Sequence, residues 1–248
     1  MSIIRFGLPN PIAAFTAAVT VLGATTISAI PAQAFAPVTI GFNCVTSGSS
    51  AIATQACDAG ENQFKARIEE VAGNPGQVLF RFMNTIRSNG SSIAASIIGV
   101  FFEDTGVQSL GSIAQLNAGN QGIVDFRQSS SNLPGAPGFT TDFAARSDPN
   151  APGLTVNGIN LGEELGIIMN INSGFTDPIN AVITDLQLGG LRLGLRATGF
   201  GGANLEYSAS FVNSAVPEPM TMLGTGAAIG LGAFMKRRQA LKKKGAVG

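Results

Sequence analysis

The stretch that decides the fold is FKARIEEVAGNPGQVLFRF, residues 64–82. Apolar residues occupy every second position on both sides of a turn sequence, as in a half-buried strand: Phe64, Ala66, Ile68, Val78, Phe80 and Phe82. The GNPG sequence at 73–76 is typical of a tight turn. The stretch therefore predicts a β-hairpin. A helix over 64–72 stays open as an alternative, because Phe64, Ile68 and Val71 also follow helical spacing.

Segments of similar character continue outward from this hairpin, separated by Gly, Pro, Asn and Ser. The further strands that we expect cover residues 38–42, 93–102, 112–116, 123–127, 165–171, 191–200 and 205–212. About nine short strands joined by turns predict an all-β domain, a two-layer antiparallel β-sandwich of jelly-roll or immunoglobulin-like type.

One short helix and one long connection interrupt the predicted strands. Asp177 can cap a helix that has Pro178 in its first turn and ends at Gly189, with Ile179, Val182, Ile183 and Leu186 on one face. Residues 129–160 are rich in Pro and Gly and predict an irregular surface excursion, with a mobile linker as the alternative.

The composition narrows the chemistry that the chain can perform. It contains no His and no Trp, which excludes Ser-His-Asp and Cys-His nucleophiles and His-ligated metals. Residues 35–215 hold eight basic and fourteen acidic side chains, so this part lacks the excess of positive charge that is typical of nucleic-acid binding. We assign no catalytic residue, no cofactor and no metal. Oxygen-ligated calcium stays open.

The N-terminus has the pattern of a secretory signal peptide. Arg5 precedes an apolar stretch over 12–30, and Ala32-Gln33-Ala34 follows as a cleavage site of small residues. We predict a signal peptide over 1–34 with cleavage between Ala34 and Phe35. An uncleaved membrane anchor is the alternative.

The C-terminus combines three parts in a fixed order. Val216-Pro217-Glu218-Pro219 is stiff and extended, because each proline fixes its own φ and disfavours helix at the residue before it. Residues 220–235 carry no charge and predict a transmembrane helix of about 24 Å. Lys236, Arg237 and Arg238 begin a basic tail, 236–248, that the positive-inside rule keeps in the cytoplasm. A plain anchor with a proline-rich spacer is the alternative.

These three parts resemble the PEP-CTERM sorting signal, in the variant common in cyanobacteria. The resemblance covers about the last 30 residues and implies recognition by an exosortase, a membrane enzyme that processes its substrates near the Pro-Glu-Pro. It implies an exported chain from a bacterium that makes exopolysaccharide. Val216, Pro217, Glu218 and Pro219 would then be recognised residues without a catalytic role.

The two cysteines and two acidic pairs are the remaining candidates in the exported part. Cys44 and Cys57 are the only cysteines, and we expect them to form a disulfide after export. The pairs Glu103-Asp104 and Glu163-Glu164 are sequence neighbours, which point to opposite faces of a strand and therefore do not face each other across a substrate. Asn89-Gly-Ser91 matches a glycosylation sequon.

These observations predict an exported, non-enzymatic protein of the cell envelope or extracellular matrix. It would be a single-pass membrane-anchored precursor whose partners are the translocon, signal peptidase, the membrane and an exosortase, with exopolysaccharide as a further candidate. The first alternative is a secreted carbohydrate-binding module, calcium-assisted or not, with a groove floored by Phe139 or Phe143. The second is an enzyme that uses carboxylates alone.

Overall fold

The computed structural model describes residues 35–46, 48, 50–87, 92–148, 156–200 and 207–213. Several predicted features lie outside these residues: the signal peptide with Ala34, the sequon at 89–91, the motif Val216-Pro217-Glu218-Pro219, the helix at 220–235, and the tail with Lys236, Arg237 and Arg238. Phe35, the first residue after the predicted cleavage, is described.

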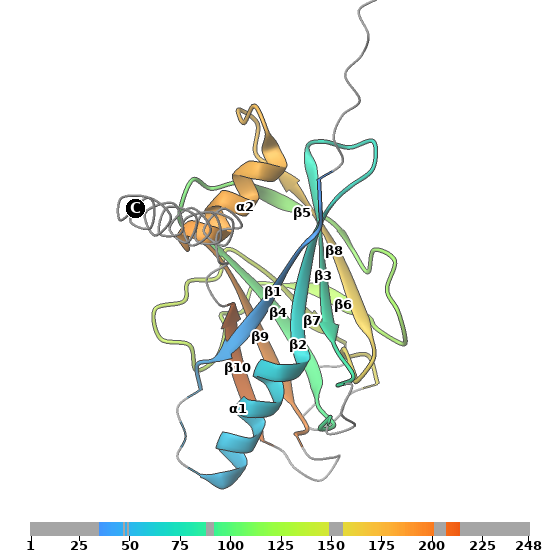
Figure 1. The fold of residues 1–248 in the computed structure, drawn as a ribbon, viewed down its shortest axis with the longest axis vertical. Helices are drawn as coiled ribbons and strands as arrows, with labels where there is room; N and C mark the ends of the chain where they lie inside the picture. The colour runs from blue at the N-terminus through green and yellow to red at the C-terminus, as the bar shows by residue number, and fades with distance from the viewer. Residues whose placement is uncertain are drawn as a thin grey trace, which may run out of the picture. The chain divides into compact units, whose positions relative to one another are not determined.

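The described part consists mainly of antiparallel β-structure, as predicted (Figure 1). Its elements are β1 (Val38–Cys44), α1 (Ala51–Gln63), β2 (Phe64–Glu70), β3 (Gln77–Asn84), β4 (Ser96–Asp104), β5 (Leu110–Leu116), β6 (Phe126–Ser129), β7 (Phe143–Ser147), β8 (Glu164–Ile171), α2 (Pro178–Leu188), β9 (Leu191–Thr198) and β10 (Ser208–Asn213).

The ten described strands form one nearly closed sheet, which differs from the two separate sheets predicted. Their order is β5-β8-β3-β2-β1-β10-β9-β4-β7-β6. The reason is β1, whose first half pairs with β2 (Val38 opposite Ile68) and whose second half pairs with β10 (Phe42 opposite Asn213). One strand thus belongs to both halves of the sheet, and the outermost strands β5 and β6 lie close together.

The predicted hairpin is confirmed, and the helical alternative over 64–72 is wrong. β2 and β3 pair in register from Phe64 opposite Asn84 to Glu70 opposite Val78. Their apolar residues are buried at every second position, which is the period of a strand with one face in the core.

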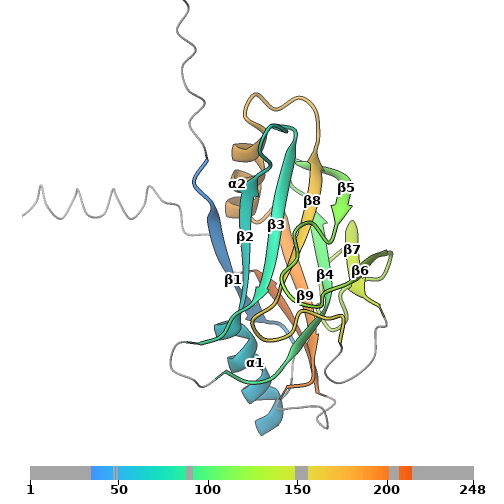
Figure 2. The same cartoon turned by 90° about the vertical axis from the view of Figure 1, so that its right-hand side faces the viewer.

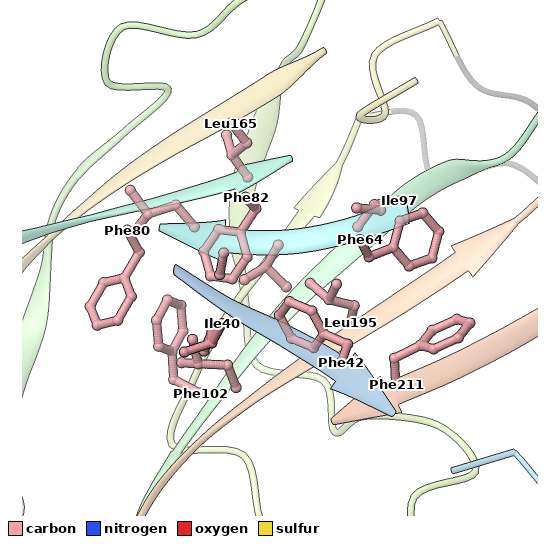
Figure 3. Close-up of a cluster of buried hydrophobic side chains, with 14 of the residues drawn as sticks. Ile40, Phe42, Phe64, Phe80, Phe82, Ile97, Phe102, Leu165, Leu195 and Phe211 are labelled. Atoms are coloured by element: carbon pink, nitrogen blue, oxygen red, sulfur yellow. The ribbon is translucent and has the colours of Figure 1, made fainter. Parts of the chain in front are cut away.

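Phenylalanine rings fill the space inside the sheet (Figure 3). The Phe102 ring makes edge contacts with Phe80 and Phe82, at centroid distances of 5.2 and 5.8 Å. Phe64 and Phe211 meet edge to face at 5.1 Å. All five rings are fully buried, and each contributes about 1.5–3 kcal/mol through its removal from water.

Two helices occupy opposite ends of the sheet, where one helix was predicted (Figures 1 and 2). α2 is the predicted one: Asp177 accepts a hydrogen bond from the Asn180 backbone N–H, and Gly189 ends the helix in the left-handed conformation. α1 was not predicted. Its buried face consists of Ala53, Ala56, Ala59, Gly60 and Gln63, which give little apolar periodicity.

The predicted disulfide between Cys44 and Cys57 is present. It joins the end of β1 to α1 with 5.2 Å between the two Cα atoms. The second half of the segment between the cysteines is helical, because α1 begins at Ala51. The bridge therefore fixes this helix against the sheet.

The prediction of an irregular surface excursion over 129–160 is wrong at β7, whereas residues 130–142 have no regular secondary structure and are mostly exposed. This segment contains β7, and residues 130–142, here called the strap, lie against the outer face of the sheet. Leu133 and Phe139 of the strap are buried in a second apolar cluster with Phe101 and Ala144. Gly194 beneath them makes the close approach possible, since a Cβ there would lie 2.6 Å from Leu133 Cδ2.

Candidate functional site

Two aspartates meet at the end of the sheet that α2 occupies, here called the α2 end. Asp104 is the last residue of β4 and Asp185 lies on the buried face of α2, with 5% and 2% of their surfaces exposed. The two side chains are in hydrogen-bonding contact. The nearby Asp185 carboxyl therefore makes ionisation of Asp104 less favourable.

Backbone groups of the connection between β4 and β5 hold this carboxyl pair. The Leu110 N–H donates to Asp104 Oδ2 at 2.7 Å, and the Val107 N–H donates to Asp185 Oδ1 at 3.4 Å. Gly106 and Gly190 pack tightly on the same oxygen of Asp185, because a Cβ at either position would lie about 2 Å from it. The pair thus joins β4, this connection and α2.

Burial raises the pKa of Asp104 to about 6, and the hydrogen bond and the charge of Asp185 act in the same direction. The Leu110 backbone N–H opposes the change because it stabilises the carboxylate. Asp104 Oδ1 receives no hydrogen bond from a donor of the described residues, so nothing there stabilises a charge on this oxygen. The Asp104 carboxyl, with a pKa of about 6, can therefore take up or release a proton near that pH.

A shallow hollow of about 130 Å³ lies beside Asp104. Its lining includes Gln108, Asp142, Phe143 and Asn172. Asp142 accepts a hydrogen bond from the Asp104 backbone N–H, and the Asn172 amide donates to the carbonyls of Gln108 and Leu110. These polar groups hold backbone segments in place. The two aspartates contact each other directly, whereas glycosidase carboxyl groups are about 5–9.5 Å apart across a substrate.

The acidic pairs of the sequence are separated by the fold. Glu103 and Asp104 point to opposite faces, as predicted, and Glu103 forms a buried ion pair with Arg192 and accepts a hydrogen bond from the Thr140 N–H of the strap. Glu163 accepts hydrogen bonds from the backbone N–H groups of Ile123 and Asn160, at 3.0 and 2.8 Å. These carboxylates stabilise loops.

The groove predicted at Phe139 or Phe143 is absent at Phe139. This ring is buried in the apolar cluster under the strap, with the Arg192 guanidinium 5.2 Å from its ring centre. Phe143 lies on the opposite face of the sheet, where it packs against the main core and is only partly buried. It lines the shallow hollow beside Asp104 together with Asp142.

Asp185 is the residue of this site that sequence reasoning missed. It lies between Ile183 and Leu186, on the buried face of α2. An acidic residue on the apolar face of a predicted helix is a signal for a buried carboxylate. Its partner Asp104 could not be identified from the sequence because the two are 81 positions apart.

Within the described ranges, no three acidic or sulfur side chains come together in a way that could hold a metal ion. No helix of that same part is long and apolar enough to cross a membrane. No protein-family model, curated protein or solved structure matches the chain.

Proposed function

We propose that this chain is an exported protein of the cell envelope or extracellular matrix, without catalytic activity of its own. A signal peptide directs it across the inner membrane, and an exosortase recognises Val216-Pro217-Glu218-Pro219. The observation that carries the proposal is the order of three parts at the C-terminus: the Pro-Glu-Pro sequence, the uncharged stretch 220–235 and the basic residues from Lys236 onward.

The disulfide supports export. Cysteines pair stably in oxidising compartments and stay reduced in the cytosol. Cys44 and Cys57 are the only cysteines of the chain, and they are bonded to each other. Translocon, signal peptidase and exosortase would then act in turn, and exopolysaccharide is the candidate partner after release.

The positions of the two chain ends also support a membrane-held precursor. β1 begins at the α2 end, and β10 runs toward that end but stops opposite Phe42, four residues short of the first residue of β1. The six residues 214–219 span at most about 20 Å between Asn213 and the predicted helix. A membrane helix that follows residue 219 would therefore keep the α2 end of the domain close to the membrane.

Fractionation tests this proposal. Cells carry either the wild-type chain or a variant with Pro217, Glu218 and Pro219 replaced by Ala, and the chain is followed by immunoblot. The wild-type chain is expected to become smaller and leave the membrane fraction, whereas the variant keeps its precursor size there. If both chains have the same size and fractionate identically, the proposal is wrong and the Pro-Glu-Pro sequence is only a spacer.

A further inference from the structure

Three arginines form a row across the outer face of the sheet. Arg127 on β6 lies opposite Arg146 on β7, Arg146 lies opposite Gly99 on β4, and Gly99 lies opposite Arg196 on β9. Directly paired residues of antiparallel strands share a face. The neighbours of these arginines along each strand point into the core, among them Ala145, Phe126 and Leu195. The arginine row therefore spans three strand spacings, about 14 Å.

The positive charge of this row is largely uncompensated. Arg127 forms a solvent-exposed ion pair with Asp148 at 2.7 Å. Arg146 and Arg196 have no carboxylate partner among the described residues, and Arg146 Nε is buried without a hydrogen-bond acceptor. Arg196 donates to the Ser210 hydroxyl at 3.2 Å. The gap left by Gly99 is partly occupied by the ring of Phe101, which is apolar.

A second pair of opposed arginines shows what compensation looks like in this molecule. Arg67 on β2 lies opposite Arg81 on β3, on the other half of the sheet. Glu69 lies between them, with ion-pair distances of 2.5 Å to Arg67 Nε and 2.9 Å to Arg81 Nε. Among the residues that the structure describes, no carboxylate joins Arg146 and Arg196 in this way.

Like charges in neighbouring positions of a sheet destabilise it. Burial lowers the pKa of Arg196, and the charge of Arg146 lowers it further, which shows that the two guanidinium groups repel each other. Bound anions would remove this repulsion. Guanidinium groups suit carboxylate and sulfate groups in particular, because their planar fork can donate two parallel hydrogen bonds.

We propose that the arginine row is a binding site for an acidic polysaccharide, with one anionic sugar group at Arg127, one at Arg146 and one at Arg196. A polysaccharide fits better than a nucleic acid, because Phe101 and Phe139 on this face of the sheet are buried and offer no face for stacking bases. The inference rests on the proposed export, which brings the domain into contact with extracellular polymers.

Binding to polygalacturonate, which carries one carboxylate per sugar, tests the inference on the purified full chain in detergent. The test variant is Arg146→Gln with Arg196→Gln, which removes both charges and keeps most of each side-chain stem. The matched control is Arg67→Gln with Arg81→Gln, which removes the same charge from the opposed pair on the other half of the sheet. Neutral dextran and a single-stranded oligonucleotide are the comparison ligands.

The wild-type chain is expected to bind polygalacturonate in a salt-dependent way and to ignore dextran. The test variant should bind at least about tenfold more weakly, since each lost hydrogen bond between charged groups is worth about that factor. The control variant should bind like wild type. Equal loss in both variants, no binding by wild type, or tighter binding of the oligonucleotide would each overturn the inference.

These outcomes are separable from the fate of the proposed function. Purified chain can bind polygalacturonate even if cells neither export nor sort it, and that result would contradict the sorting proposal alone. Conversely, a chain that is sorted normally and does not bind polygalacturonate would contradict the polysaccharide inference alone. The test variant should also fractionate like wild type, because its substitutions lie far from residues 216–219 in the sequence.

Discussion

Replacing Asp185 by Asn should stabilise the protein at neutral pH and flatten the pH dependence of its stability. In the wild type, folding raises the pKa of Asp104 from 3.8 to about 6. The folded state therefore binds the proton more tightly than the unfolded state does. This group contributes stability that is fully present below about pH 3.8 and is lost as the pH rises through about 6.

The size of the effect follows from the two pKa values. A difference of about two pH units corresponds to about 3 kcal/mol of unfolding free energy lost between pH 4 and pH 7. Burial, the largest cause, persists in the variant, whereas the second negative charge disappears. The Asn amide can donate to the Asp104 carboxylate and has the shape of the carboxyl group that Gly106 and Gly190 enclose. We expect the variant to regain about 1 kcal/mol at pH 7.

Thermal unfolding of the full chain between pH 4 and pH 8, followed by circular dichroism, measures this effect. About 1 kcal/mol corresponds to about 2–4 °C for a domain of this size. Asp58→Asn is the matched control, since Asp58 is exposed on α1 and its substitution makes the same change in charge. The reasoning is refuted if Asp185→Asn keeps the wild-type slope, or if the control flattens it equally.

Three further predictions concern the disulfide, the packing around Asp185 and the α2 end. Cys57→Ala should cost about 3 kcal/mol and lower the unfolding midpoint, and an unchanged midpoint would contradict the role given to the bridge. Gly106→Ala should destabilise strongly, because its Cβ would lie 2.0 Å from Asp185 Oδ1, whereas Gly76→Ala meets no atom within 4 Å and should be neutral. When the chain is bound to vesicles, brominated lipids should quench the tryptophan fluorescence of Leu188→Trp, at the α2 end, and should not quench that of Ile123→Trp. Equal quenching in both variants would argue against a domain whose α2 end faces the membrane.

Local patterns predicted those parts of the fold that depend on local physics. The recurrence of Val78, Phe80 and Phe82 at every second position identified β3, and Asp177 and Gly189 marked the ends of α2. α1 was missed because Ala and Gly form its buried face, and β7 because it is short and follows a Pro- and Gly-rich stretch.

Features that depend on distant residues could not be predicted. The closure of the sheet depends on β1 pairing with both β2 and β10, and no local pattern encodes a strand with two partners. The arginine row likewise arises from register, since Arg127, Arg146 and Arg196 come from separate strands. The sequence gives the number of these arginines for the net charge, but it does not reveal that they lie side by side in the fold.

The mass of the intact protein released from its native cells tests the central claim most directly. We predict a chain that begins at Phe35, lacks the residues after the Pro217-Glu218-Pro219 region, and has two hydrogens fewer than its sequence requires because Cys44 and Cys57 are bonded. A mass that includes residues 1–34 or the basic residues Lys236, Arg237 and Arg238 would contradict the account.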